Sequence, residues 1–283
     1  MNNNIFPVVV LYKRKLSDAE SINSLLDSDE LELIKDIYVY DNTPVEFDNN
    51  EYHIKTFRGR NVIYFRDYQN SGVSKAYNCG MSKAHELGYK YALLLDQDTV
   101  FPRNAFSHYK SAMSNNPGIN LIVPRLVTLG GEFCSPLRYA FHRGFITGEL
   151  AAGIYSLEKY SPINSGMLLD VATALSCGGY NDGVYLDFSD FQFIERLKRV
   201  SVNFYVMPLT IQQDLSNEDE NHENLLTRYA IYCDCATRCE RNAYTDDLIY
   251  FMMVFIRGLK LAKRTKKIKF LKIFYQKYMR GKK

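Results

Sequence analysis

Short apolar runs alternate with longer amphipathic stretches along the first half of the chain. The apolar positions that follow Gly72 recur at 3.6-residue spacing, which predicts a helix through Ala84. The apolar runs are typical of strands buried in a parallel sheet, and they occupy residues 6–12, 34–40, 62–66 and 93–95. Alternation of this kind predicts an open α/β sheet with right-handed crossovers, which binds ligands beyond the carboxyl ends of its strands.

In the first half of the chain, Ser17, Asp18, Ala19 and Glu20 form a capping-box pattern that predicts the start of a helix.

The second half of the chain is less regular. Further strands are predicted at residues 121–124, 167–171 and 203–207, a helix at 188–200, and helices from residue 222 onward. We therefore expect an α/β domain over residues 1–215 and a helical C-terminal extension over 216–283, with the boundary in the polar stretch 216–224.

The basic charge is concentrated in the tail. Residues 257–283 hold 12 of the 35 basic side chains and no acidic ones, which leaves 23 basic against 32 acidic side chains upstream, a net charge of −9. The tail also places apolar side chains on one helical face, at Ile268, Leu271, Phe274, Tyr275 and Tyr278. Such a helix fits a membrane surface, where each cation contributes about 1 kcal/mol near anionic lipid. The negative upstream part argues against nucleic acid, and a tail helix packed on its own domain stays an alternative.

Cysteine usage and the N-terminal sequence bear on the compartment. The segment MNNNIFPVVV lacks a basic stretch followed by a signal-length apolar core, and we interpret Cys233, Cys235 and Cys239 as buried helix thiols. The longest apolar run, residues 248–256, is far shorter than the roughly 20 residues of a membrane-spanning helix. We expect a cytoplasmic protein at the inner face of the cell membrane.

Two carboxylates follow the fourth apolar run, in the turn Asp96-Gln97-Asp98. A strand end places them at the edge of the sheet, where paired like charges are unfavourable unless a cation offsets them. Mg²⁺ or Mn²⁺ bridging a carboxylate to phosphate oxygens meets that need, since both ions prefer oxygen ligands. Taken alone, the turn is equally compatible with solvated acidic residues.

The residues around this turn carry a family resemblance. Residues 70–99 combine an N-x-G-x-x-x-A-x-N-x-G pattern with a strand that ends in D-Q-D-T, and this segment resembles family-two glycosyltransferases of the rhamnosyltransferase-like branch. The likeness extends to residues 40–43, 164–166 and 186–190. It implies a GT-A fold, which is a Rossmann-like, mostly parallel sheet flanked by helices, together with a nucleotide-sugar donor, a divalent metal and inversion at the anomeric carbon.

The resemblance assigns residues to the donor side. Asp41 corresponds to the acid that hydrogen-bonds the pyrimidine base, with a turn aspartate as the alternative. Lys75 corresponds to a basic residue near the donor, and a solvated helix lysine is the alternative. Asp96 corresponds to the residue at the ribose or metal shell, and Asp98 to the direct metal ligand. The full donor-binding set is Tyr12, Asp41, Asn70, Lys75, Asn78, Asp96 and Gln97.

The acceptor side is assigned in the same way. Asp190 corresponds to the general base that removes the acceptor hydroxyl proton, and Asp187 supports it or orients the acceptor. Ser165 and Gly166 line the same cleft. Acidic residues at a helix start are also stabilised by the macrodipole, so a purely structural cap is the alternative for the acidic pair.

One position departs from the family pattern. Gln213 stands where a metal-binding His is expected, so the predicted metal residues are Asp98, Asp96 and Gln213. Asp214 is a possible substitute ligand, and His222 a weaker one.

The sequence thus predicts metal-dependent inverting transfer of rhamnose or a hexose from a dTDP- or UDP-sugar to a lipid-linked cell-surface glycan. A rival, sugar nucleotidyltransferase activity, needs a Gly-rich loop after the first strand, where this chain reads LYKRKLSD. A second rival, a non-catalytic sugar-binding relative, is kept open by Gln213.

Overall fold

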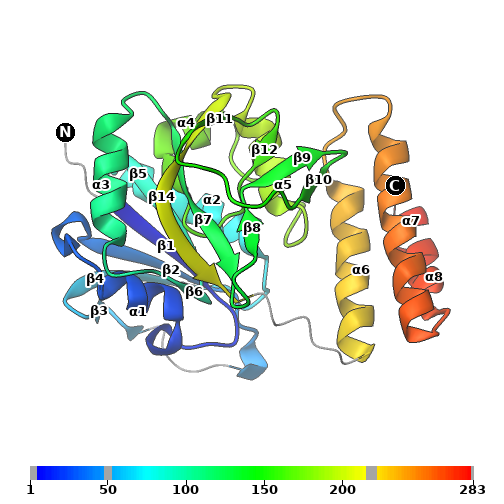
Figure 1. The fold of residues 1–283 in the computed structure, drawn as a ribbon. Coiled ribbons are helices and arrows are strands. Elements are labelled where there is room, and N and C mark those ends of the chain that lie inside the picture. The colour runs from blue at the N-terminus through cyan, green and yellow to red at the C-terminus, as the bar shows by residue number, and fades with distance from the viewer. Residues whose placement is uncertain (1–4, 48–52, 215–221, 282–283) are drawn as a thin grey trace.

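The computed structural model describes residues 5–47, 53–214 and 222–281. A large mixed sheet occupies the centre of the N-terminal part, and a group of helices formed by residues after 221 stands beside it (Figure 1). The order of strands across the sheet is β11 (Gly153–Ser156), β14 (Asn203–Gln213), β7 (Leu121–Thr128), β13 (Leu168–Asp170), β5 (Tyr91–Asp96), β1 (Ile5–Leu11), β2 (Asp36–Asp41), β4 (Arg60–Arg66) and β3 (Thr56–Phe57).

The middle of the sheet is parallel. Strands β5, β1, β2 and β4 run in one direction, β7 and β14 are parallel to each other, and β13 is antiparallel between β5 and β7. Strand β1 is fully buried except at one intermediate position, because helices cover both faces of the sheet. The predicted α/β sheet, mostly parallel and flanked by helices, is confirmed.

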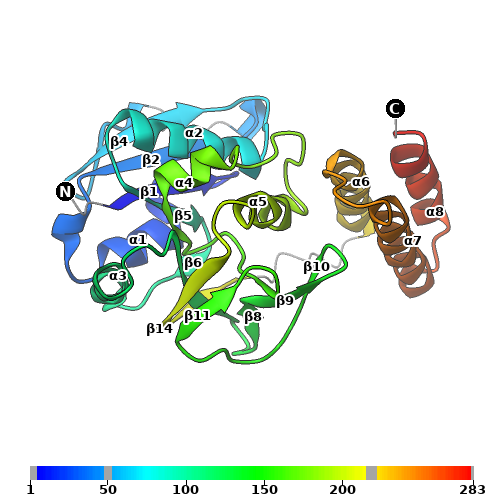
Figure 2. The same ribbon diagram turned by 90° about the horizontal axis from the view of Figure 1, so that it is seen from above.

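Two helical layers pack on opposite faces of this sheet. Helices α1 (Glu20–Leu26) and α3 (Ala105–Asn115) cover the face that carries Val9, whereas α2 (Val73–Glu86), α4 (Val171–Ser176) and α5 (Ser189–Leu197) cover the face that carries Val8 (Figure 2). Helix α2 buries the face predicted from its spacing. A Cβ on Gly80 would lie 2.3 Å from Cγ1 of Val8, so this glycine permits the close approach of α2 to β1.

The predicted capping box is not formed. A short 3₁₀ turn, η1 (Leu16–Asp18), precedes α1, and Ala19 is the N-cap without a side-chain hydrogen bond. The hydroxyl of Ser17 donates to its neighbour Asp18 over 3.1 Å instead. Because α1 begins at Glu20, Ser17 lies too far ahead of the helix to be its N-cap.

A small second sheet was not predicted. It consists of β10 (Arg143–Phe145), β9 (Leu137–Ala140) and β12 (Tyr160–Ser161), and β8 (Phe133–Ser135) pairs with β7. These strands are too short to show an alternating pattern. The hairpin formed by β9 and β10 reaches toward the C-terminal helices, where His142 bonds Asp246 over 2.8 Å.

The C-terminal helices form a compact group with its own apolar core. They are α6 (His222–Arg238), α7 (Asp246–Thr265), α8 (Lys269–Ile273) and a π-helical turn, η5 (Phe274–Met279). Phe274 and Tyr278, which the sequence assigns to the apolar face of the tail, are buried in this core with Cys233 and Cys235. All six cysteines are free thiols. Across the described ranges, no helix is both long and apolar enough to span a bilayer.

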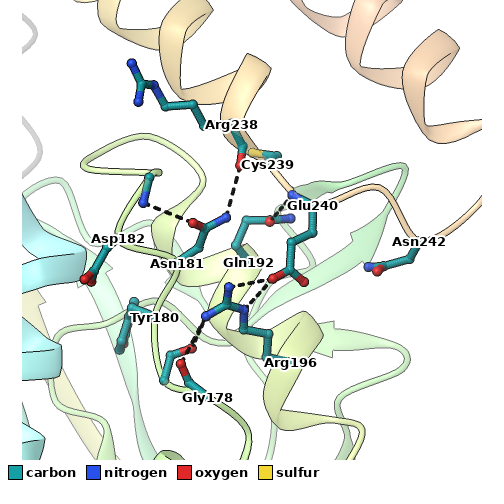
Figure 3. Close-up of polar contacts among 12 residues, drawn as sticks. Gly178, Tyr180, Asn181, Asp182, Gln192, Arg196, Arg238, Cys239, Glu240 and Asn242 are labelled. Atoms are coloured by element: carbon teal, nitrogen blue, oxygen red, sulfur yellow. Dashed lines mark hydrogen bonds and ion pairs between the residues drawn. The ribbon is translucent and has the colours of Figure 1, made fainter. Parts of the chain in front are cut away.

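Polar contacts join the C-terminal helices to the sheet domain (Figure 3). Arg196 on α5 pairs with Glu240, which follows α6, through two hydrogen bonds of 2.8 and 2.5 Å. Its remaining nitrogen donates to the carbonyls of Gly178 and Gly179. Gln192, one turn earlier on α5, accepts the backbone N–H of Glu240 at 2.6 Å. Helix α5 is therefore bonded both to residue 240 after α6 and to the loop at Gly178 and Gly179. Of the predicted boundary stretch 216–224, residues 216–221 lie outside the described residues, and residues 222–224 belong to the start of α6.

Candidate active site

The acidic turn lies where β5 leaves the sheet. Asp96 is the last residue of β5, and β6 (Thr99–Val100) pairs with the end of β14, so that Gln213 lies opposite Thr99. The backbone N–H of Tyr12 donates to Oε1 of Gln97 over 2.9 Å, which ties the end of β1 to the turn. The turn is thus held between the ends of three strands.

Asp96 lies in a partly buried position beside other carboxylates. The hydroxyl of Tyr77 on α2 donates to its Oδ1 over 2.7 Å. Burial raises the pKa of Asp96 to about 7, and the charges of Asp98 and Asp190 add to the effect. The influence of Asp190 on Asp96 shows that the structure brings the predicted donor and acceptor sides together, although 94 positions separate them in sequence.

A chain of side-chain hydrogen bonds supports Asp98. Nε2 of Gln213 donates to Oδ1 of Asp98 over 2.5 Å, and Oε1 of Gln213 accepts the hydroxyl proton of Thr99, also over 2.5 Å. The Ser165 hydroxyl, 2.5 Å from that of Thr99, is then the donor, because Thr99 has only one proton. Ser165 also accepts the backbone N–H of Asp96 at 3.3 Å. The chain therefore connects the carboxylate of Asp98 to the backbone N–H of Asp96.

The carboxylates of this turn fit a hard divalent cation. Burial raises the pKa of Asp98 and that of Asp96, and the charge of Asp98 raises the pKa of Asp96 further, so positive charge at the turn would stabilise both carboxylates. Mg²⁺ binds through one or two carboxylates together with substrate phosphates. Within the described ranges, no cluster of three or more His, Cys, Asp or Glu side chains could hold an ion. The residues that would hold a cation at this turn are Asp98 and Asp96, together with the phosphates of a bound ligand.

The side chains predicted to assist the metal have other contacts. The oxygen of Gln213 faces Thr99, so Gln213 orients Asp98 through its nitrogen in this arrangement. Asp214 donates its backbone N–H to the carbonyl of Asp98 over 3.2 Å. The side chain of His222 lies outside the described residues.

The second acidic pair surrounds the start of α5. Asp190 accepts the N–H of Phe191 at 2.8 Å, and burial raises its pKa to about 6, with Asp187 adding to the rise. Asp187 accepts from Arg228 on α6 over 3.2 Å. Phe188, between the two acids, has a left-handed backbone with φ 69°. Its buried ring packs on aromatic rings of the C-terminal helices, so those helices hold the loop that presents both acids.

Three aromatic side chains near the acidic residues pack on one another. Tyr180 stacks on Phe193 with ring centres 4.2 Å apart and lies 5.4 Å from the ring of Tyr77. Burial raises the pKa of Tyr180, and the nearby charges of Asp190 and Asp96 raise it further. Sequence reasoning identified Tyr77 only as a core position and did not identify Tyr180. The only available signal was an aromatic residue that follows the Gly178-Gly179 pair.

Asp41 lies at the end of β2, as predicted, within a buried polar group. It forms an ion pair with Arg66 and accepts the hydroxyl of Tyr64 over 2.7 Å. The backbone N–H of Thr43 donates to its second oxygen over 2.9 Å. These contacts fix the carboxylate in place.

Three other predicted donor residues lie at the start of α2. Asn70 has a left-handed backbone with φ 51° and lines a pocket of about 320 Å³ together with Asp182 and Arg238. Lys75 contacts Asp182 over 3.3 Å, and Asn78 donates to the same aspartate over 2.6 Å. Asn78 also bonds both backbone groups of Tyr180, so it holds the loop beneath the acidic residues.

Gly166 takes a conformation that suits glycine. Its φ is 80°, and a Cβ would lie 2.7 Å from Cγ of Pro124 and 2.8 Å from Cδ1 of Ile211. Its N–H donates to the carbonyl of Leu94 on β5 over 2.8 Å. This close approach keeps Ser165 beside the acidic turn.

Comparison with known proteins agrees with this geometry. The chain superposes on S. aureus TarS 1–349 in complex with UDP-GlcNAc with a TM-score of 0.60 at 12% identity, covering 96% of this chain and 79% of that one. It superposes on GalNAc-T7 with UDP, GalNAc and Mn²⁺ with a TM-score of 0.59 at 12% identity, covering 86% and 52%. No curated protein matches the chain in sequence.

The likeness to these structures shows the GT-A fold. The family model for Glycosyl transferase family 2 matches residues 8–167, which is more than half of the chain and includes β1, α2 and the acidic turn. The chain therefore belongs to glycosyl transferase family 2.

Proposed function

We propose that this glycosyltransferase inverts the anomeric centre while transferring a sugar from a dTDP- or UDP-sugar to a lipid-linked glycan acceptor. The observation that carries the proposal is that Asp190 lies near Asp96: Tyr77 bonds Asp96 and packs beside Tyr180, which stacks on helix α5, and the charge of Asp190 raises the pKa of Asp96. One end of this acidic group suits a cation and a diphosphate, and the other end suits an acceptor hydroxyl. The complexes of TarS with UDP-GlcNAc and of GalNAc-T7 with UDP, GalNAc and Mn²⁺ support a nucleotide-sugar donor.

Asp190 is the general base in this mechanism. A carboxylate with a pKa of about 6 is mostly ionised at neutral pH and is a stronger base than an exposed aspartate. It accepts the acceptor proton as the hydroxyl oxygen attacks the anomeric carbon from the face opposite the nucleotide. Burial is the main cause of the raised pKa of Asp190, and the charge of Asp187, which pairs with Arg228, adds to it.

Asp96 and Asp98 would hold a Mg²⁺ or Mn²⁺ ion at the diphosphate end of the donor. When bound, the ion would supply positive charge against the charge that develops on the departing nucleoside diphosphate. Gln213 and Tyr77 orient the two carboxylates by hydrogen bonds, so that their oxygens need little rearrangement when the cation binds.

The proposal also covers the sugar that is transferred and the place of the protein in the cell. The rhamnosyltransferase-like pattern of residues 70–99 favours dTDP-rhamnose, whereas the UDP complexes of structural neighbours favour a UDP-hexose. We place the protein in the cytoplasm at the inner face of the cell membrane, because the basic residues after Arg257 suit anionic lipid.

The test is donor turnover by the full chain. Wild type is assayed with dTDP- and UDP-sugars, Mn²⁺ or EDTA, and an acceptor panel, beside Asp190→Asn and Asp98→Asn. The matched control is Asp27→Asn, whose side chain is 58% exposed and far from the acidic turn in sequence. We expect activity in wild type and the control, at least a hundredfold loss in Asp190→Asn, and loss of Mn²⁺ response in Asp98→Asn.

The competing function is a non-catalytic sugar-nucleotide-binding protein, which Gln213 keeps open. A wild type that binds a nucleotide sugar, seen as a rise in Tm with ligand, but turns over none of the panel would support that function. Equal turnover by wild type and Asp190→Asn would refute the role of Asp190.

A further inference from the structure

Helix α7 carries a row of exposed apolar side chains along its outer face. Leu248, Met252, Ile256 and Leu259 are 63%, 43%, 41% and 42% exposed. Their spacing of four, four and three residues places them on one side of the helix. The opposite side is buried, as shown by Tyr250 and by Val254. We call the four exposed residues the α7 stripe.

The stripe lies on α7, one of the helices that stand beside the sheet domain (Figure 1). Helix α6 stands between the sheet domain and the pair formed by α7 and α8 (Figures 1 and 2). The bundle core uses the other sides of α7, where Phe251 packs on Phe274 with ring centres 5.5 Å apart. The sequence assigned Phe274 and Tyr278 to the apolar face of the tail, and both are buried here. Of the same predicted face, Ile268 and Tyr275 stay exposed at 79% and 53%, so the apolar surface of these helices includes the α7 stripe together with these two residues.

Positive charge surrounds the C-terminal half of the stripe. Lys263 lies four residues beyond Leu259 and continues the same helical face, and Lys260 and Arg264 are exposed beside it. From residue 257 to the last residue the sequence contains no Asp or Glu. Among the described residues, these three cations have no ion pair with a carboxylate. Exposed apolar rows are rare on soluble surfaces unless they bind something.

We propose that the α7 stripe and its cations dock the enzyme on an anionic lipid bilayer. The apolar side chains enter the boundary between headgroups and acyl chains, and the lysines and arginine contact lipid phosphates. A second copy of the chain is the other occupant that an apolar helix face can take. Two such faces would bring their cations together, whereas an anionic bilayer neutralises them, so charge complementarity selects the bilayer.

This inference rests on the proposed membrane location but not on the transfer reaction. Vesicle binding is measured without donor, acceptor or metal, so failure of binding and failure of catalysis are separate results. Helix α7 contacts the sheet domain through Asp246 and Tyr250, which are buried and are not part of the stripe, so a bilayer contact through the stripe leaves these contacts in place.

The experiment is co-sedimentation of the full chain with phosphatidylglycerol-containing vesicles and with pure phosphatidylcholine vesicles. The stripe variant is Met252→Gln/Ile256→Gln/Leu259→Gln, and its matched control is Leu87→Gln/Val200→Gln, two apolar residues exposed elsewhere at 44% and 50%. We expect wild type and control to bind anionic vesicles alike, and the stripe variant to bind at least tenfold more weakly. All three should have the same urea midpoint within error and the same turnover of a soluble acceptor.

A second variant, Lys260→Gln/Lys263→Gln/Arg264→Gln, tests the charge. It should lose the preference for anionic over neutral vesicles, and added salt should weaken wild type but not this variant. Absence of wild-type binding, or full binding by the stripe variant, would overturn the proposal. Light scattering provides one more test. A wild type that is dimeric, a stripe variant that is monomeric and no vesicle binding by either protein would also overturn the proposal and would assign the stripe to a second copy.

Discussion

Replacement of Asp190 by Asn should stabilise the metal-free protein while it removes the proposed base. Asp190 is partly buried at the start of α5, and its pKa is raised from the ordinary 3.8 to about 6, first by burial and then by the charge of Asp187. A raised pKa means that the folded chain holds the proton more tightly than the unfolded chain does. Ionisation of Asp190 therefore costs stability, and a neutral Asn removes that cost.

The size of the effect follows from the two pKa values. Below about pH 4, Asp190 is protonated in both states and the ionisation cost is absent. Between pH 4 and 6 the unfolded chain releases the proton first, and above pH 6 the full cost is present. At about 1.4 kcal/mol per pH unit, the difference between 3.8 and about 6 gives about 3 kcal/mol, and partial exposure reduces this to about 2–3 kcal/mol. Asn keeps an oxygen that can accept the N–H of Phe191.

Urea unfolding in EDTA at pH 4, 6 and 8 measures this directly. The stability of Asp190→Asn relative to wild type should rise by about 2–3 kcal/mol between pH 4 and pH 8, with unchanged dependence on urea. The exposed control Asp27→Asn should show no such trend. A constant difference at all three pH values, or a variant less stable than wild type at pH 8, would refute the reasoning. Stability gained with activity lost also excludes misfolding as the cause of inactivity.

Two further predictions concern the reaction and the core. Turnover at saturating donor and Mn²⁺ should fall as pH drops through about 6, because a protonated Asp190 cannot act as the base. Asp187→Asn removes a nearby negative charge, so the same fall in turnover should occur at a lower pH. A fall at an unchanged pH would contradict the effect of Asp187 on the pKa of Asp190. Gly80→Ala should destabilise by about 1–3 kcal/mol in urea, since a Cβ meets Val8 at 2.3 Å, whereas Gly130→Ala, whose nearest contact is 3.6 Å, should be nearly neutral.

The parts of the fold predicted from sequence are those whose pattern is local. Strand β1 and strand β5 are continuous apolar runs because both faces of a parallel sheet are covered. Helix α2 is recognised because its buried positions repeat with the helical period. The acidic turn could be placed at the sheet edge for the same reason, since a buried strand runs directly into it.

The missed features depend on contacts between distant residues. The short hairpin of β9 and β10 has too few residues for a period, and its tip is held by His142 against α7. The pattern of residues 257–283 predicts one helix, but Phe274 and Tyr278 pack on Phe251 of α7. Because Phe251 lies outside the tail, the tail sequence alone does not reveal this contact. The approach of Asp190 to Asp96 is of the same kind, and only the family resemblance anticipated it.

The C-terminal helices belong to the architecture of the acidic site. Val184 and Phe188, which precede the predicted division at residue 215, share one apolar core with Tyr232 and Tyr250 beyond it. Phe188 keeps a left-handed backbone that a bulky residue adopts only when surrounding contacts fix it. Its ring lies 4.7 Å from that of Tyr232. Because Phe188 separates Asp187 from Asp190, packing within this core sets the direction in which both carboxylates point. The chain beyond residue 221 therefore supports the acidic site, and its outer helix α7 can serve a different surface without disturbing that support.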